Sequence, residues 1–468
     1  MLFRGGAEAA IRREIVRRGL IKGIIGLPAN LFYGTGIPAC IIVLDKEHAA
    51  ARKGIFIVDA SKDFIKDGPK NRLRAQDIHK IVDIFTRRID LPRYARTVPL
   101  AEIEANDFNL NLPRYIDNTE PEDIQDIDGH LRGGIPVRDL DALTEYWEVF
   151  PAVRAVLFKK ADRPGYSQLK VPPGEIKKTI FDHAEFAVFT SGVNSLFAKW
   201  KKAATHTLKG IAIGAKPKAL IEALSEEMLE TFRKAPLLDA YDIYQHLMDY
   251  WAGTMQDDVY MIVHDGWKAV IDGKPNADLL PPSLIIARYF ATERAAIEKF
   301  EADRDAIARQ MEEVDEEQGG EEGPLADGKT DKGKLTAKSV KDRLKAIKSD
   351  KDAGEERTAL EGYLKLIEQE SDAGRKVKDA QKALDALVAT KYGKLTEAEI
   401  KTLVVDDKWL TTIAAAVQGE LDRVSQTLTG RIRQLAERYA APLPQIVDEV
   451  ATLAARVDGH LKKMGTVR

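Results

Sequence analysis

This 468-residue sequence has a single cysteine, Cys40, and no apolar run approaching 18 residues. One cysteine excludes an intrachain disulfide and fits a reducing cytoplasm, so we expect Cys40 to be a small buried hydrophobe. The short apolar runs predict no membrane span, and Arg4 and Glu8 interrupt the N-terminus too early for a signal peptide. The sequence therefore predicts a cytoplasmic protein without a membrane partner.

A strong excess of one charge is also absent, because the formal net charge is only −3. If the protein has a DNA-binding face, that face must therefore come from an uneven distribution of charge. No Ser-His-Asp or Cys-His constellation is legible. The stretch around Gly214 lacks the GK[ST] of a phosphate loop, which leaves nucleotide hydrolysis without support. His246, Asp249, Asp257, Asp258 and His264 match no compact ligand spacing, so we expect no metal.

Two short apolar runs, Ile24–Leu27 and Cys40–Leu44, organise the N-terminal region. Continuous β-branched runs of this length are typical of strands buried on both faces. The loop between them contains Phe32, Tyr33, Gly34, Thr35 and Gly36. Glycine permits positive φ and a close approach of the backbone to a ligand, and two adjacent aromatics suit stacking. The alternative is a tight hairpin whose aromatics cap the core.

Periodicity predicts the neighbouring elements. Residues 1–6 are expected to end a strand, Ala7–Arg18 and Gln76–Arg88 to be helices, and Ile55–Val58 to be a strand. Strands alternating with helices are typical of an α/β domain, here with an incomplete sheet that has an open edge.

The apolar period becomes helical from residue 140 onward, with an aromatic core that includes Phe186, Phe189 and Trp200. The acidic, Gly-containing segment 312–334 is predicted to be a disordered linker. Heptad-like runs follow it and predict a helical hairpin or coiled coil. The last two runs, starting at Leu421 and at Ile446, are separated by Pro442 and Pro444.

The N-terminal phrases resemble the catalytic domain of the methylation subunits of type I restriction-modification systems, which are N6-adenine DNA methyltransferases. The resemblance rests on the stretch Gly23–Lys46, on LFRGGAEAAIRREIV before it, and on KGIFIVDAS, NRLR and NDFNLNLPRYID after it. Leu237–Trp267 and the tail resemble the helical extensions of a subgroup.

The family's glycine-bearing turn for S-adenosylmethionine and its Asn-Pro-Pro-aromatic tetrapeptide do not occur in this sequence. The resemblance therefore implies a C-terminal portion of a methylation subunit, with both motifs expected upstream of residue 1. On this interpretation the chain has no catalytic and no cofactor-binding residues, and binds no S-adenosylmethionine by itself. Met1–Phe3 would end the family's fifth strand.

The resulting fold prediction is α/β followed by mostly α: a partial Rossmann-like sheet, a helical domain and a coiled-coil tail. The predicted domains are the C-terminal half of the catalytic domain, a linker, a helical domain, the disordered acidic linker and a tail for subunit assembly, at residues 1–117, 118–135, 136–311, 312–334 and 335–468.

For function, the resemblance implies transfer of a methyl group to adenine N6 in DNA by the intact complex, with the chain inactive alone. The flipped base would be held by Phe32–Gly36. Implied partners are DNA, a specificity subunit, a second methylation subunit and a restriction subunit. Phosphate contacts are predicted for Lys70, Arg72, Arg74, Arg87 and Arg88. The alternative for these is a solvated helix face paired with acids such as Asp77 and Asp83.

Two other functions are compatible with the sequence. A non-catalytic helical scaffold would bind the specificity subunit through residues 335–468. A helical nucleic-acid-binding protein unrelated to methylation is disfavoured by the near-neutral charge.

Overall fold

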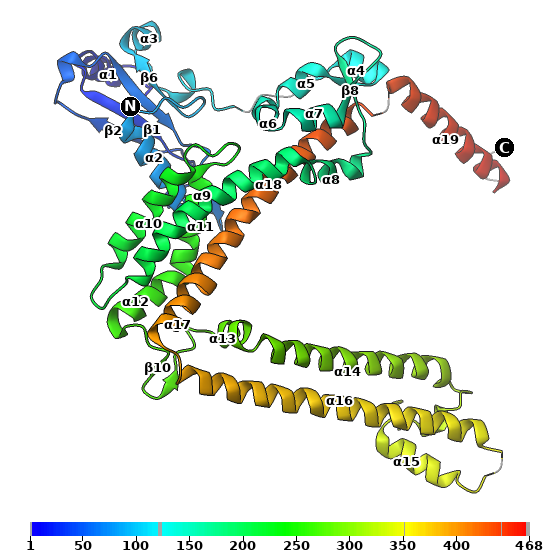
Figure 1. The fold of residues 1–468 in the computed structure, drawn as a ribbon. Coiled ribbons are helices and arrows are strands. Elements are labelled where there is room, and N and C mark those ends of the chain that lie inside the picture. The colour runs from blue at the N-terminus through cyan, green and yellow to red at the C-terminus, as the bar shows by residue number, and fades with distance from the viewer. Residues whose placement is uncertain (1, 120–123, 351, 441, 465–468) are drawn as a thin grey trace. The chain divides into compact units, whose positions relative to one another are not determined.

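The computed structural model describes residues 2–119, 124–350, 352–440 and 442–464 (Figure 1). These residues form two compact units. The first comprises the described parts of Met1–His206, Lys216–Gln256 and Thr412–Arg468, and the second those of Thr207–Ala215 and Asp257–Thr411. No helix in the described ranges combines the length and the apolar character that a membrane span requires.

The N-terminal part of the first unit is a mixed four-stranded sheet with the order β2-β1-β3-β6. β1 is parallel to β3, whereas the β1–β2 and β3–β6 pairs are antiparallel. The elements of this region are α1 (Ala7–Arg17), β1 (Ile21–Gly26), β2 (Cys40–Leu44), β3 (Gly54–Asp59), β4 (Ile65–Asp67), β5 (Lys70–Arg72), α2 (Ala75–Arg87), β6 (Ala95–Pro99) and α3 (Leu100–Ala105).

Successive side chains of a strand point to opposite faces of the sheet. Both faces of this sheet carry apolar side chains, and a helix packs on each face. Ile55 and Ile57 of β3 pack in a cluster with Val16 of α1. Phe56 and Val58 of the same strand pack with Ile81 and Ile84 of α2 on the opposite face. Figure 1 shows α1 and α2 on opposite sides of the strands.

Two predictions for this region are wrong. Residues 2–6 form no strand; the Leu2 carbonyl instead accepts a hydrogen bond from the Leu110 N–H. β2 is not buried on both faces, because it is an edge strand with exposed residues, Cys40 among them. An apolar run predicts a strand but not the position of that strand in its sheet. The sheet is mixed, and a Rossmann-like order is not shown.

The first unit continues with helices and a small three-stranded sheet of order β7-β9-β8, which the sequence did not predict. Residues 124–135, within the predicted linker 118–135, include a helix with its N-cap at Asp126. The elements are α4 (Ile127–Arg132), β7 (Ile135–Pro136), α5 (Val137–Asp141), α6 (Thr144–Val149), α7 (Pro151–Leu157), β8 (Phe158–Lys160), β9 (Tyr166–Leu169), α8 (Ile176–Phe181), α9 (Ala184–Lys209), α10 (Pro217–Phe232), α11 (Ala240–Tyr250), α18 (Thr411–Arg438) and α19 (Leu443–Lys463).

The predicted aromatic core is confirmed in these helices. Phe186, Phe189 and Trp200 are buried, and the Phe189 ring lies 5.5 Å from the ring of Phe150 in an edge-to-face arrangement. The predicted break between the last two helices is also confirmed, because Pro442 is the N-cap of α19.

The second unit is built on two long helices, α14 and α16, that run side by side (Figure 1). A π-helical segment, Trp251–Met255, precedes α12, and another, Thr402–Leu410, precedes α18. The elements are α12 (Gln256–Asp265), β10 (Val270–Ile271), β11 (Lys274–Pro275), α13 (Pro282–Tyr289), α14 (Ala291–Gln318), α15 (Ala337–Ala346), α16 (Gly354–Tyr392) and α17 (Glu397–Lys401).

Two predictions fail here. The segment 312–334 is not a disordered linker: α14 extends to Gln318, and Leu325 is fully buried in a cluster with Val340 and Leu360. The many charged residues of this segment led to a prediction of disorder, although its few apolar residues anchor it. Residues 335–468 are not one tail, because they divide between the two units and α16 packs mainly along α14.

Candidate functional site

The loop Leu27–Ala39 follows the C-terminal end of β1 and leads into β2. Its ends are joined by a hydrogen bond of 2.9 Å from the Leu27 N–H to the Ala39 carbonyl. Since β1 and β3 are parallel, the loop emerges at the edge where both strands end, which is where α/β sheets bind ligands. The chain topology thus places this loop where a binding site is expected.

The base of the loop is fixed by the β4–β5 hairpin. Asn71, which is buried, donates from its N–H to the Asn30 carbonyl at 3.0 Å and from Nδ2 to the Ala29 carbonyl at 2.7 Å. Asn30 itself has a left-handed backbone, with φ 53°, a conformation that asparagine tolerates. The backbone N–H and the side chain of one buried residue therefore hold two successive carbonyls of the loop.

The tip of the loop depends on its glycines in two different ways. Gly34 has φ 80°, which requires glycine. At Gly36 the constraint is space, because a Cβ there would lie 3.0 Å from Asn30 Oδ1. Thr35 Oγ1 accepts a hydrogen bond from the Ile37 N–H at 3.1 Å and closes the turn between them.

The two aromatic side chains at the tip do not cap the core. Phe32 is 52% exposed and Tyr33 is 94% exposed, whereas the apolar clusters of the sheet are closed by other residues. Lys70 binds the loop at this point: its Nζ donates to the Phe32 carbonyl at 2.8 Å and lies 5.8 Å from the centre of the Tyr33 ring. The loop therefore presents two aromatic surfaces and a cation to solvent.

The five predicted phosphate contacts have different surroundings. Arg72 pairs with Asp67 at 3.1 Å, and Arg87 pairs with Asp83 at 3.2 Å. Arg74 and the buried Asp77 form three hydrogen bonds of 2.8 to 3.0 Å, which close the N-terminus of α2 and raise the Arg74 pKa. The predicted pairing with Asp77 and Asp83 is thus present in the structure.

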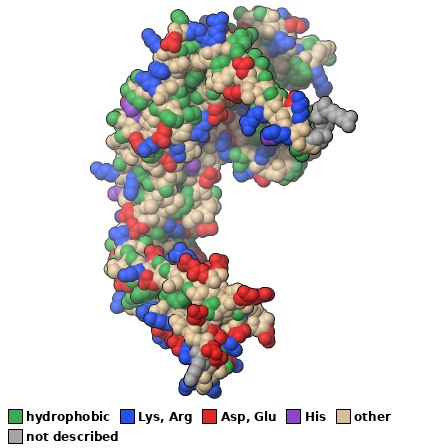
Figure 2. Space-filling model, turned by 90° about the vertical axis from the view of Figure 1, so that its right-hand side faces the viewer, with side chains coloured by type: hydrophobic (Ala, Val, Ile, Leu, Met, Phe, Trp, Pro, Cys, Tyr) green, Lys and Arg blue, Asp and Glu red, His purple; other side chains and the backbone are tan. Residues whose placement is uncertain are grey.

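Lys70 and Arg88 are the remaining two. Lys70 contacts the loop, and the exposed Arg88 forms no ion pair with any described residue. Figure 2 shows Lys and Arg interspersed with Asp and Glu over the face in view, in keeping with the small net charge. Of the five predicted phosphate contacts, Lys70 and Arg88 are therefore the two that form no ion pair with an acid of the described residues.

Sequence reasoning did not identify a polar hollow of about 420 Å³ beside the β5–α2 turn, where α11 and α18 approach. His246 Nε2 lies 2.9 Å from Glu420 Oε1, and Arg423 binds both Glu420 and Asp242. Gln76 Nε2 donates to Asp242 Oδ1 at 2.8 Å, which ties α2 to α11. The bonds among His246, Glu420, Arg423 and Asp242 therefore tie α11 to α18 at this hollow.

The other residues considered as metal ligands lie apart. His246 and Asp249 are at this hollow, whereas Asp258 belongs to the second unit, where it accepts hydrogen bonds from Lys408 Nζ and from Trp409 Nε1. His264 Nδ1 lies 2.9 Å from Asp265 Oδ1 at the surface. Within the described ranges, no group of three or more His, Cys, Asp or Glu residues is arranged to hold a metal ion.

Comparison with known proteins bears on the region that carries the loop. The family model described as "N-6 DNA Methylase" matches residues 1–124. Residues 1–124, called the methylase segment below, make up about a quarter of the chain and are similar in sequence to the N-6 DNA methylases. The resemblance to type I methylation subunits inferred from the sequence is confirmed by named relatives.

The methylase segment is 42% identical over 131 residues to the MjaVII methylase subunit of a type I restriction enzyme of Methanocaldococcus jannaschii; the match covers 27% of this chain and 22% of that protein. It is 34% identical over 122 residues to the MpnII methylase subunit of Mycoplasma pneumoniae, with 26% and 22% covered. The chain therefore spans about a quarter of the length of the curated relatives that it matches.

Among solved structures, a type I restriction-modification methyltransferase subunit of Streptococcus thermophilus is 40% identical. The match covers 25% of each chain with a TM-score of 0.24.

Proposed function

We propose that this chain takes part in the methylation of adenine N6 in DNA by a type I restriction-modification complex, and that the loop Asn30–Gly36 forms part of the wall that holds the target base. The observation that carries the proposal is the exposed pair Phe32 and Tyr33, on a loop whose base is fixed by Asn71, within the methylase segment.

Adenine N6 is paired inside the duplex, so the base must leave the stack before it reacts. Enzymes of this kind hold the extruded base by stacking and by hydrogen bonds to its edge. Each stacking contact between a base and an aromatic side chain contributes about 1–3 kcal/mol. Phe32 and Tyr33 offer two such surfaces, and Lys70 places a cation beside them for a flanking phosphate.

Methyl transfer requires S-adenosylmethionine, and the residues of this chain do not fit that cofactor. An apolar cavity of about 70 Å³ below the sheet, lined by Ile21, Ile42 and Leu110 among others, is far smaller than the roughly 300 Å³ that a ligand of this size occupies. The polar hollow near Gln76 is large enough, at about 420 Å³, but its lining is mostly charged and amide side chains and lacks the apolar surface against which an adenine ring packs. No step of the transfer is therefore assigned to a cofactor held by this chain.

The proposed partners follow from the family. DNA and a specificity subunit would select the site, a second methylation subunit would complete the methyltransferase, and a restriction subunit would join the complex. The chain's described helices, which occupy most of the sequence beyond the methylase segment, would make these contacts.

The test is methylation by the chain reconstituted with its specificity subunit, S-adenosylmethionine and any further methylation subunit. Phe32→Ala and Tyr33→Ala are each expected to lower kcat/KM about 10-fold, since the loss of one stacking contact is worth about 1–3 kcal/mol. Tyr260→Ala removes a comparably exposed aromatic from α12 and is the matched control. Unchanged rates in both loop variants would remove the base-holding role.

Lys70 is tested by salt dependence. Lys70→Ala is expected to weaken DNA binding uniformly across sequences and to reduce the slope of log K against log salt by about 1. Lys53→Ala, an exposed lysine that precedes β3 at the other end of the sheet, is the control and should leave the slope unchanged. Equal slopes for all three proteins would show that Lys70 contacts no phosphate.

A second candidate function is a non-catalytic helical scaffold that binds a specificity subunit. The family match ends at residue 124 of 468, and α14, α16 and α18 each exceed 25 residues. Co-purification of the specificity subunit with this chain is expected under this proposal, and a failure of the two proteins to co-purify would contradict it.

A further inference from the structure

α19 differs from every other long helix of the first unit, because none of its residues is buried. Leu443, Val450, Leu453 and Val457 are each at least half exposed, and Met464, directly after the helix, is 75% exposed. Figure 1 shows α19 projecting beyond α18, with α4 near its start. An exposed apolar stripe along an entire helix is typical of a surface that another helix covers.

The stripe follows a heptad. Leu443, Val450, Val457 and Met464 recur at intervals of seven, and Ile446 and Leu453 occupy the intervening positions at intervals of three and four. Val450 with Leu453 has the order, β-branched at the first position and Leu at the second, that favours two strands, whereas Leu443 with Ile446 at the start of the helix does not. The pattern therefore indicates that α19 packs against another helix with a knobs-into-holes contact.

Charge along α19 indicates which helix. Its first ten residues carry Asp448 and Glu449, a net charge of −2, and the remaining residues to Lys463 carry Arg456, Asp458, Lys462 and Lys463, a net charge of +2. Two copies in antiparallel orientation place the acidic half of each against the basic half of the other. A parallel pair would place like charges together, which is unfavourable.

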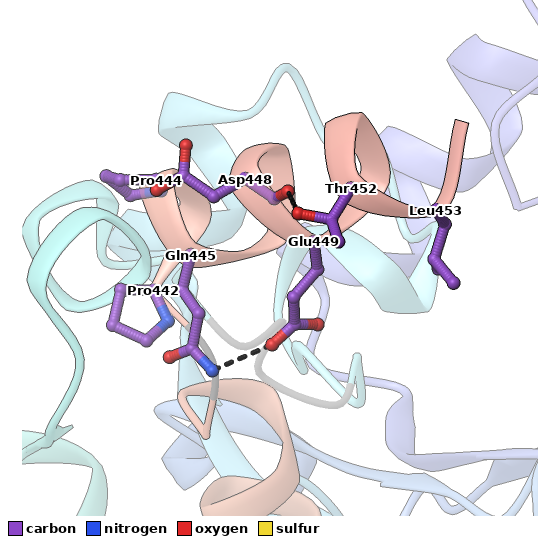
Figure 3. Close-up of a pocket in the computed structure, with 7 residues that line it drawn as sticks. All are labelled: Pro442, Pro444, Gln445, Asp448, Glu449, Thr452 and Leu453. Carbon is purple, nitrogen blue, oxygen red and sulfur yellow. Dashed lines mark hydrogen bonds between the residues drawn. The ribbon is translucent and has the colours of Figure 1, made fainter. Parts of the chain in front are cut away.

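The flank of the helix that carries the acids is ordered. Gln445 Nε2 donates to Glu449 Oε1 at 2.9 Å, and Thr452 Oγ1 donates to the Asp448 carbonyl at 2.8 Å. Figure 3 shows Gln445 and Glu449 projecting together from one side of α19, with Leu453 one turn farther along on the same side. In the antiparallel alignment, Leu453 lies opposite Val457 of the second copy, and Glu449 lies near Lys463.

We propose that α19 pairs antiparallel with α19 of a second copy of this chain. The contact is isologous, since the same stripe serves on both copies and the arrangement closes as a dimer. This inference depends on α19 alone and not on the methylation proposal, so a failure of one leaves the other standing.

The first test is sedimentation velocity of the full chain over rising concentration. The expected result is a shift from the monomer mass to twice that mass. Val450→Asp with Val457→Asp should abolish the shift. Ala451→Asp with Ala455→Asp adds the same charge to the outward side of the same helix and should retain it. A chain that stays monomeric, or dimerisation that survives the first pair of substitutions, would overturn the proposal.

Orientation is tested by disulfide trapping in a Cys40→Ser background. Position 450 of one helix lies opposite position 460 of the other when the pair is antiparallel. Val450→Cys mixed with His460→Cys should therefore cross-link, whereas each variant alone should not. Efficient cross-linking of each variant alone would indicate a parallel pair and contradict the proposed alignment.

Discussion

α18 and α19 are neighbours in the chain and have the same apolar spacing, yet their surroundings are opposite. α18 buries ten residues, among them Leu421, Leu428 and Ile432, whereas α19 buries none. The heptad pattern therefore predicts an apolar face on a helix, but it does not predict whether the same chain covers that face. Three substitution experiments test how far this difference extends.

The largest effect is expected at Leu421, which is fully buried in α18. Leu421→Ala removes buried methyl groups and leaves a cavity, so we expect a loss of about 2–5 kcal/mol in the free energy of unfolding of the first unit. Urea denaturation followed by tryptophan fluorescence measures it. A loss below about 1 kcal/mol would mean that α18 is no more buried in solution than α19.

An intermediate effect is expected at Glu420, which anchors α18 to α11. Glu420→Gln weakens charge-assisted bonds to His246 and Arg423, and we expect a loss of about 1–2 kcal/mol near pH 6. The hydrogen bond with Glu420 raises the His246 pKa above its ordinary value of 6.5. The stability from this pair is therefore fully present below pH 6.5 and is lost as pH rises through the raised pKa.

The Glu420 carboxyl contributes the opposite dependence of stability on pH. Burial raises its pKa, but the hydrogen bonds from His246 and Arg423 outweigh burial and lower it, so its contribution is present above pH 4.5 and is lost as pH falls through the lowered value. In the wild type, the free energy of unfolding measured between pH 4 and 8 should fall toward the acidic end and should also fall above pH 6.5. In Glu420→Gln the loss of stability above pH 6.5 should be smaller than in the wild type. An equal loss would show that Glu420 does not set the His246 pKa.

The smallest effect is expected at Leu453 of α19, the counterpart of Leu421. Leu453→Ala alters a side chain that is 55% exposed, so the free energy of unfolding should change by less than about 0.5 kcal/mol. The measurement belongs at a concentration below that of self-association, since the proposed dimer would otherwise add to it. A large loss in the dilute monomer would show that α19 packs within its own chain.

Much of the local structure was predictable from the sequence. The helices expected at Ala7–Arg18 and Gln76–Arg88 are observed at Ala7–Arg17 and Ala75–Arg87, because apolar spacing and end signals are local. The position of a strand in its sheet is not local: Cys40–Leu44 reads like Ile24–Leu27, yet one lies at an edge and the other is central. Pairing between distant segments decides this.

The candidate loop shows the same division. Its glycines and aromatics were recognisable in the sequence, and Gly34 has the predicted positive φ. The anchoring by Asn71 was not predictable, because it joins residues about 40 positions apart through one buried side chain. The ion pairs of Arg72, Arg74 and Arg87 with acids likewise could be identified only from the structure.

The base-holding role of the loop is tested most directly by photocross-linking. DNA with 5-iodouracil in place of the target adenine is bound by the reconstituted complex and irradiated, and the cross-linked peptide is mapped by mass spectrometry. The account predicts attachment at Phe32 or Tyr33. Attachment only at residues outside Asn30–Gly36, or to another subunit alone, would contradict it.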